Sequence, residues 1–189
     1  MPTSQVWLQL AVYLALLAAL AWPMGAWLAA VAEGRLPRWL TPLAKLESLL
    51  YRAGGINASA STSWQRYAVA TVAFNVVGVL AVYSLQRLQG VLPLNPAALA
   101  AVSPDSAFNT AVSFVTNTNW QSYVGETTMS YFVQMAALTV QNFMSAAVGI
   151  AIAIALVRGF ARQSVETIGN FWVDVTRATV YVLLPISFV

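Results

Sequence analysis

The sequence has no cysteine and no histidine among its 189 residues. Without cysteine the chain forms no disulfide and offers no thiolate to a metal. Without histidine it has no serine–histidine triad, no histidine-based zinc site and no histidine general base. An intramembrane enzyme is also disfavoured because the acids Asp105 and Glu126 are not a spaced pair on one helix.

Charged residues are scarce as well. They make up 8% of the chain, whereas soluble domains carry about 25%. Hydrophobic residues make up 59%, and the mean hydropathy is +0.70. This composition indicates a polytopic, all-α membrane protein. The net charge of +3 does not point to nucleic acid, because the basic residues cluster where membrane topology places them.

Long apolar runs predict the membrane spans. We expect spanning helices over residues 6–27, 67–88, 130–157 and 171–189. No basic residue precedes the first run, which therefore favours a plain spanning helix over a secretory signal peptide. The last run reaches the end of the sequence, so we expect an N-terminal fragment of a longer protein.

Basic residues predict the orientation. Residues 33–66 form the most charged stretch, with Arg35, Arg38, Lys45, Arg52 and Arg66. Arg158 and Arg162 follow the third span. By the positive-inside rule both loops are predicted to be cytoplasmic, which puts the N-terminus outside.

A short amphipathic helix is predicted inside the first basic loop. Thr41-Pro42 suits its start and Gly54-Gly55 its end. Its apolar face is made of leucines, namely Leu43, Leu46, Leu49 and Leu50. Lys45, Glu47 and Arg52 are expected to stay on the polar side. We favour a helix in the membrane interface, and a docking surface for another subunit is the alternative.

A half-length helix and a polar run lie between the second and third spans. Ser103-Pro104-Asp105 supplies an N-cap, a first-position proline and an acid at the positive helix end. A helix over 104–115 would be roughly 18 Å long, about half a bilayer core. Its C-terminal carbonyl end favours a cation. We expect 116–122 to follow as an extended strand with carbonyls facing the same cation, as in cation filters.

Isolated polar residues in the spans have more than one interpretation. Four of them are spaced seven, four and four residues apart and therefore share one face of the third span: Gln134, Gln141, Ser145 and Gly149. This face is predicted to look toward the half-length helix and the polar run, and ordinary polar contact between helices is equally supported. Asn75 is interpreted as a helix–helix hydrogen bond. Asp174 and Arg177 are close enough to pair and receive no transport role.

Several strings then occur in a set order along the chain. They are YRAGG (51–55), WQRY (64–67), LPLNP (92–96), NTAVSFV (109–115), TNTNWQSY (116–123), GETT (125–128) and TVQNF (139–143). In these strings the sequence closely resembles the KdpA family, the potassium-binding and translocating subunits of the bacterial ATP-driven Kdp potassium pump. The resemblance runs along almost the whole chain and covers about the N-terminal third of the family's usual length.

The resemblance implies a fold of the superfamily of K⁺ transporters, related to potassium channels. Such a protein has an extra first helix and four membrane–pore-loop–membrane repeats around one pore. This chain would hold the first helix, the first repeat and the opening helix of the second. It would lie in the bacterial inner membrane, bound to the ATPase subunit KdpB, the accessory subunit KdpC and the small peptide KdpF. A non-transporting assembly or regulatory subunit is the alternative function.

The resemblance also implies the ion site. The filter residues would be Val115, Thr116, Asn117, Thr118, Asn119 and Gln121. Backbone carbonyls of Thr116, Asn117 and Thr118 would hold K⁺, while Asn117 and Gln121 would influence selectivity. The subunit would bind and translocate K⁺ without being catalytic itself.

Channel filters use glycine to turn successive carbonyls inward, and residues 115–121 contain none. We expect Asn117 or Asn119 to take the left-handed conformation instead, because asparagine tolerates it best among non-glycine residues.

Overall fold

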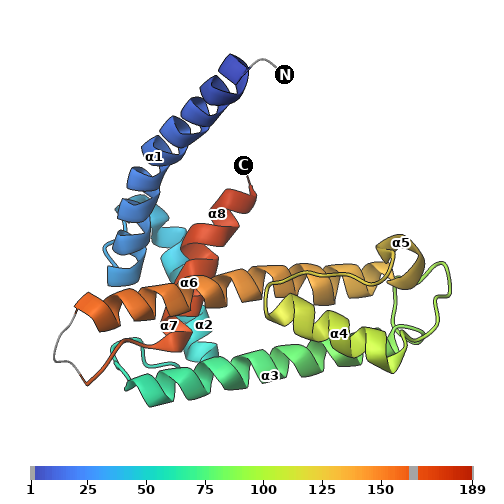
Figure 1. Cartoon of the computed structure of the whole chain (residues 1–189). Coiled ribbons are helices and arrows are strands. Elements are labelled where there is room, and N and C mark those ends of the chain that lie inside the picture. The colour runs from blue at the N-terminus through green and yellow to red at the C-terminus, as the bar shows by residue number, and fades with distance from the viewer. Residues whose placement is uncertain (1–2, 162–165, 189) are drawn as a thin grey trace. The chain divides into compact units, whose positions relative to one another are not determined.

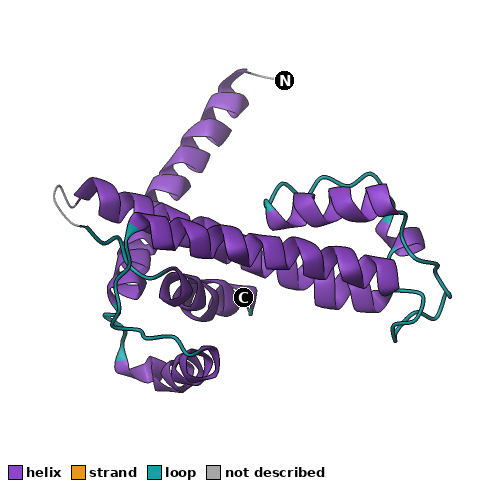
Figure 2. Ribbon diagram, turned by 90° about the horizontal axis from the view of Figure 1, so that it is seen from below, coloured by secondary structure: helices purple, strands orange, loops and turns teal. Residues whose placement is uncertain are grey.

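A computed structural model of the chain describes residues 3–161 and 166–188. The chain forms two compact units, Met1–Lys45 and Leu46–Val189, which are described separately. Both are helical, and the described residues contain no β-strand beyond a single bridge between Thr62 and Gly169 (Figure 2). The predicted all-α fold is confirmed.

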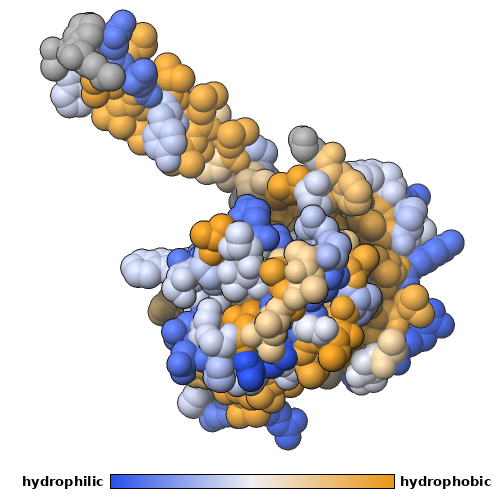
Figure 3. All heavy atoms as spheres, turned by 90° about the vertical axis from the view of Figure 1, so that its right-hand side faces the viewer, coloured by the Kyte–Doolittle hydropathy of each residue, from blue (hydrophilic) through white to orange (hydrophobic). Residues whose placement is uncertain are grey.

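The first unit consists of one long helix and a short connection. Helix α1 (Thr3–Glu33) is apolar along its length, as its orange surface shows in Figure 3. It is longer than the predicted 6–27, because no helix breaker follows until Gly34, whose φ is 72°. The Gly34 and Arg35 amides bond back to the Val31 and Ala30 carbonyls, which closes the helix with a glycine cap. The turn η1 (Arg38–Leu40) leads into α2 (Thr41–Gly54).

The second unit is a bundle around two long helices. Its elements are α3 (Trp64–Leu88), α4 (Pro104–Val115), α5 (Gly125–Thr128), η2 (Val133–Thr139), α6 (Val140–Ala161), α7 (Phe171–Arg177), η3 (Ala178–Leu183) and α8 (Leu184–Ser187). The π-helical η2 and α6 form one continuous helix that runs antiparallel to α3, and α4 packs beside α3 (Figure 1). The half-length helix has the bounds that its capping residues predict.

Within the described residues, three helices are long and apolar enough to cross a membrane: Gln5–Glu33, Trp64–Leu88 and Val133–Ala161. The predicted fourth span, 171–189, is helical over Phe171–Ser187. That helix is shorter than the roughly 20 residues that span a bilayer core.

Two apolar cores hold the second unit together. One joins α3, α4 and η2 through residues such as Val82, Ala111, Phe114 and Val133. The other joins α3, α6 and α7 through Tyr67, Ala147, Ala151, Phe171 and Val175. The ring centroids of Tyr67 and Phe171 lie 5.6 Å apart in an edge-to-face contact. Small residues at these contacts let the helices approach closely, as is typical of membrane bundles.

Candidate functional site

Helix α4 carries the polar run on a buried base. Ala107, Ala111 and Phe114 face the first core and are almost fully buried. Ser103 occupies the N-cap position, although its side chain makes no capping hydrogen bond, and Pro104 starts the helix. The C-terminal end of α4 is therefore fixed by packing against α3 and η2.

Asn117 ends the helix in the left-handed conformation, with a φ of 58°. The Thr118 amide donates to the Ser113 carbonyl at 3.0 Å, and the Asn117 amide donates to the Phe114 carbonyl at 3.3 Å. This pair of bonds is the Schellman arrangement, in which glycine is the usual left-handed residue and asparagine the common substitute. Asn119 is also left-handed, with a φ of 54°. Both asparagines therefore take the left-handed conformation, which was expected of one or the other.

Residues 116–122, here called the capping loop, curl around Ser113. The Ser113 carbonyl accepts the amides of Thr118 and Asn119, and the Ser113 hydroxyl accepts the Trp120 amide at 2.6 Å. The predicted extended strand is therefore wrong in detail: the segment is a turn followed by irregular chain. The two left-handed residues are the reason, because they reverse the chain direction where a strand would continue.

The capping loop changes which carbonyls are free. Donors from the loop occupy the carbonyls of Val112, Ser113 and Phe114, so these are not the cation-facing groups expected at the helix end. Within the described residues, no hydrogen bond reaches the carbonyl oxygens of residues 115–118. Thr116, Asn117 and Thr118, the three expected carbonyl ligands, belong to this set. Residues 116–121 are all exposed.

The loop side chains fold partly back onto the protein. The Thr116 hydroxyl donates to the Val112 carbonyl at 2.9 Å, and the Thr118 hydroxyl donates to the Ser113 carbonyl at 3.1 Å. The Asn117 side-chain carbonyl accepts from Asn119 Nδ2 at 3.3 Å and from the Ser145 hydroxyl at 3.4 Å. Gln121 lies at the exposed end of the loop. The backbone, more than the side chains, is left available to a ligand.

The residues of the polar face predicted on the third span contact different segments of the protein. Ser145 reaches the capping loop, whereas Gln134 donates to the Met129 carbonyl at 2.9 Å and so serves the connection around α5. Gln141 is 6% exposed, and its amide nitrogen has no hydrogen-bond partner in the described part of the chain. It lies against Gly78, where an added Cβ would stand 3.2 Å from the Gln141 side-chain oxygen.

A cavity of about 730 Å³ lies between α3, α4 and α6, beside the capping loop. Its polar lining comes from Asn75, Thr116, Asn117 and Ser145, and Gly149 completes the α6 wall. The interpretation of Asn75 as a helix–helix contact is not what the structure shows. Its amide donates to the Thr71 carbonyl of the same helix at 2.9 Å, because Thr71 is one turn away.

Glutamines that sequence reasoning missed join the end of α3 to α4 and to the connection around α5. Gln89 is 1% exposed, donates to the Thr128 carbonyl at 2.9 Å and accepts the Ser130 amide at 3.1 Å. Gln86 is buried and donates to the Ala107 carbonyl at 3.2 Å. Their signal in the sequence is the placement of two amides at the end of an apolar run, which requires internal partners. Polar and apolar residues lie side by side on the surface of this end (Figure 3).

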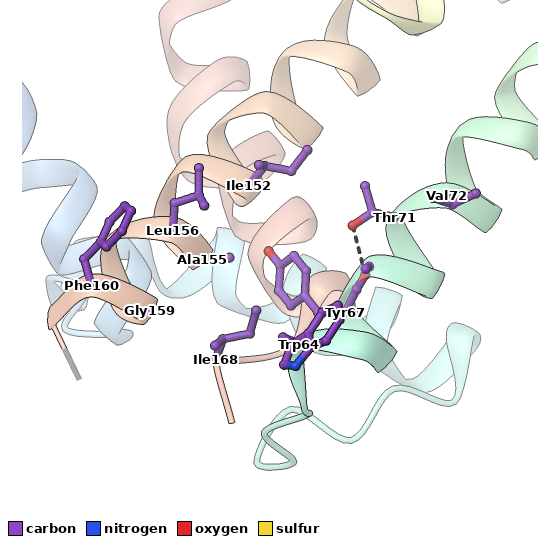
Figure 4. A pocket seen from close by; sticks show the side chains of 11 residues that line it. Trp64, Tyr67, Thr71, Val72, Ile152, Ala155, Leu156, Gly159, Phe160 and Ile168 are labelled. Atoms are coloured by element: carbon purple, nitrogen blue, oxygen red, sulfur yellow. Dashed lines mark hydrogen bonds between the residues drawn. The ribbon is translucent and has the colours of Figure 1, made fainter. Parts of the chain in front are cut away.

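A cluster of an ion pair and a tyrosine occupies the opposite end of the second unit. Asp174 is 2% exposed and forms a two-pronged ion pair with Arg158, at 2.7 and 3.0 Å. The Tyr67 hydroxyl donates to the same carboxylate at 3.1 Å. The Asp174 cluster, as we call these three residues, ties the ends of α3, α6 and α7 together. Close by, an apolar cavity of about 500 Å³ opens between α3 and α6, with Trp64 and Ile152 in its lining (Figure 4).

A second cluster surrounds Glu47 of α2. The carboxylate accepts from Arg177 at 2.9 Å, from the Tyr181 hydroxyl at 2.5 Å and from the Tyr51 hydroxyl at 2.6 Å. Burial alone would raise the pKa of Glu47, but the bonds from Tyr181, Tyr51 and Arg177 outweigh it and lower the pKa. Two expectations are therefore corrected. Glu47 is buried instead of solvated, and Arg177 pairs with Glu47 while Asp174 pairs with Arg158.

The fold and the capping loop together define a class: an all-α membrane protein in which a half-length helix presents free backbone carbonyls. The family model named KdpA, described as the potassium-transporting ATPase A subunit, matches residues 11–189. The chain belongs to the KdpA family, as its motifs predict.

Curated relatives agree with this assignment. One from Methylibium petroleiphilum is 67% identical over 186 residues, which is 98% of this chain and 32% of the relative. One from Chromobacterium violaceum is 62% identical over 185 residues, 96% of this chain and 30% of the relative. Both are named potassium-transporting ATPase potassium-binding subunit. The chain thus spans about a third of the length of these relatives.

Proposed function

We propose that this chain is part of the potassium-binding and translocating subunit of an ATP-driven potassium importer, and that residues 115–121 form one wall of its selectivity filter. The observation that carries the proposal is the set of consecutive carbonyls at 115–118, which accept no hydrogen bond from the described residues. The names of the relatives support the choice of ion.

The geometry suits a weakly held, partly dehydrated cation. Carbonyl dipoles replace the water around K⁺ without adding a fixed charge. The C-terminal end of α4 carries partial negative charge and favours a cation nearby. One loop covers only one side of an ion, so the other walls come from the longer subunit. In this proposal ATP hydrolysis belongs to the partner subunit KdpB, and KdpC and KdpF complete the complex.

The proposed orientation follows the charges. Arg66 and Arg158 lie at the end opposite the capping loop, which supports our proposal that this end faces the cytoplasm of a bacterial inner membrane and that the N-terminus lies outside. Asp105 and Glu126 are exposed at the other end, where they would concentrate cations. In this orientation α7, η3 and α8 begin a fourth span.

Labelling with a membrane-impermeant maleimide checks this orientation, because the chain has no native cysteine. Val91 is 84% exposed in the loop before α4. Val91→Cys is expected to react in intact cells, while Ala58→Cys in the basic loop reacts only after the membrane is opened. The reverse pattern would overturn the topology.

Gln121 tests the ion site. Gln121→Arg places a fixed positive charge roughly 8 Å from the bound ion, which costs about 2 kcal/mol at an effective dielectric near 20. The K⁺ concentration that half-saturates ATPase activity should then rise roughly thirty-fold. Gln121→Glu should cause no such loss, because its charge attracts the ion.

The measurement is K⁺-stimulated ATPase activity of the purified complex whose subunit contains this sequence, at equal assembly of each variant. A folding defect would impair both variants together. If Gln121→Arg kept the wild-type half-saturation concentration for K⁺, neither Gln121 nor the capping loop would lie on the ion path.

A further inference from the structure

We infer that Ser145 of α6 is a positioning residue for the filter: it holds the Asn117 turn, and thereby the carbonyls of residues 116–118, at a fixed place. The inference deepens the proposed function and rests on it. Ser145 is 3% exposed. Its hydroxyl lies 3.4 Å from the Asn142 carbonyl of its own helix and 3.4 Å from the Asn117 side-chain oxygen. Within the described residues, this is the one hydrogen bond that joins residues 116–121 to a spanning helix.

Apart from the contact with Ser145, the bonds that hold the capping loop come from α4. Ser113 binds it through its carbonyl and hydroxyl, so every one of those bonds leads back to α4. The loop's outer surface is exposed. A turn anchored only at its base can tilt, and a tilt moves three successive carbonyls together. The contact with Ser145 adds a second anchor from a different helix.

Tight packing of α6 holds Ser145 in a fixed position. Ala147 and Ala151 are fully buried in the second core, and Val148 is 5% exposed. Ser145 therefore has little freedom to follow the loop, and the serine position is set by packing far from the ion. Gln141, one turn earlier, is buried beside Val115 and makes no hydrogen bond to the loop. Ser145 is thus the α6 residue placed to fix the turn.

Asn117 has two separable roles. Its backbone takes the left-handed conformation, which glycine adopts without strain. Its side chain supplies the acceptor for Ser145. Asn117→Gly keeps the first role and removes the second, whereas Ser145→Ala removes the donor and leaves Asn117 intact. Both variants therefore delete the contact between Ser145 and Asn117, and Asn117→Gly also removes the bond from Asn119 Nδ2.

A double-mutant cycle in the assembled complex tests the contact. Ser145→Ala, Asn117→Gly and the double variant are compared by the ratio of Na⁺ to K⁺ half-saturation concentrations for ATPase stimulation. Each single variant should reduce this ratio about three- to tenfold, the range expected for one hydrogen bond. The double variant should fall no further than Asn117→Gly alone, which already lacks the contact with Ser145. Ser84→Ala, on an exposed part of α3, is the matched control and should retain the wild-type ratio.

The outcomes separate the two proposals. A merely structural serine would lower the melting temperature without changing the ion ratio, and that result overturns the positioning role. Losses that add in the double variant also overturn it, because they show two independent effects. If Gln121→Arg shifts K⁺ half-saturation but Ser145→Ala changes nothing, the filter stands and the inference fails. If neither variant changes the half-saturation concentrations, residues 115–121 do not form the filter.

Discussion

The two ends of the second unit are stabilised in opposite ways. The capping loop is built from neutral dipoles, and its carbonyls at 115–118 are left open. At the other end, the carboxylates of Asp174 and Glu47 are each paired with an arginine and accept a hydrogen bond from a tyrosine. Fixed charge therefore stabilises the packing at one end of the unit, and the loop that we propose as the filter contains no charged residue.

The reason lies in how strongly each group would hold a cation. Carbonyl dipoles bind an ion while still allowing it to leave, which transport requires. A fixed carboxylate in a site of low dielectric attracts a cation far more strongly. In the Asp174 cluster the carboxylate is paired with Arg158, so its negative charge is already neutralised. Substitutions at the two ends should therefore differ in both size and kind.

The largest effect is expected from breaking the Asp174 cluster. Asp174→Asn leaves Arg158 without its carboxylate in a largely buried place and should destabilise the subunit by about 3–5 kcal/mol. Replacing both partners, as Arg158→Met with Asp174→Leu, should recover much of this loss, because no charge is then stranded. Chemical unfolding in detergent of a subunit containing this sequence measures both. An Asp174→Asn variant as stable as the double replacement would contradict the account.

A smaller effect is expected in the capping loop. Asn119→Ala forces a Cβ residue without a polar side chain into the left-handed conformation, at a cost of about 1–2 kcal/mol. Asn119→Gly should be close to wild type, because glycine adopts this conformation freely. The K⁺ half-saturation concentration is the measurement, with Asn119→Gly as the matched control. Equal losses in both variants would show that the side chain, not the backbone, matters there.

The smallest effect is a pH dependence in the Glu47 cluster. The pKa of Glu47 is lower in the folded protein than its ordinary value of 4.5. Its ionised form therefore stabilises the fold above that pH, and the contribution is lost as the pH falls through the lowered pKa. Glu47→Gln should melt below wild type at pH 7, and the gap should narrow in acid. A gap that stays constant from pH 7 to pH 3 would exclude this role.

The sequence predicts the parts of this molecule that depend on local signals. Ser103, Pro104 and Asp105 define the start of α4 without help from the rest of the chain. The tolerance of asparagine for left-handed backbone predicts the turn at Asn117 and Asn119. Apolar length predicts four spans, and three helices in the described part of the chain are long and apolar enough to cross a membrane. The first of them, α1, ends at Glu33 beside the Gly34 cap and not at the predicted residue 27.

Tertiary geometry decides the rest. Asp174 and Arg177 are near each other in sequence, but Arg158 and Glu47 reach them from other elements with better geometry. Local pattern also cannot show that Glu47 is covered by Tyr181, which lies on a different helix. The curl of the capping loop depends on Ser113 acting as a double acceptor, and a serine inside a helix gives no sign of that role.

The bonds around Ser113 also bear on how the subunit is made. All of them join residues 113–120, so the loop can take its shape as soon as that stretch leaves the ribosome. The Asp174 and Glu47 clusters instead connect residues 107 and 134 positions apart. They can close only after the segment from 171 onward has been synthesised and inserted. The turn that we propose as part of the filter is therefore expected to form early in biogenesis, well before the ion pairs between the helices can form.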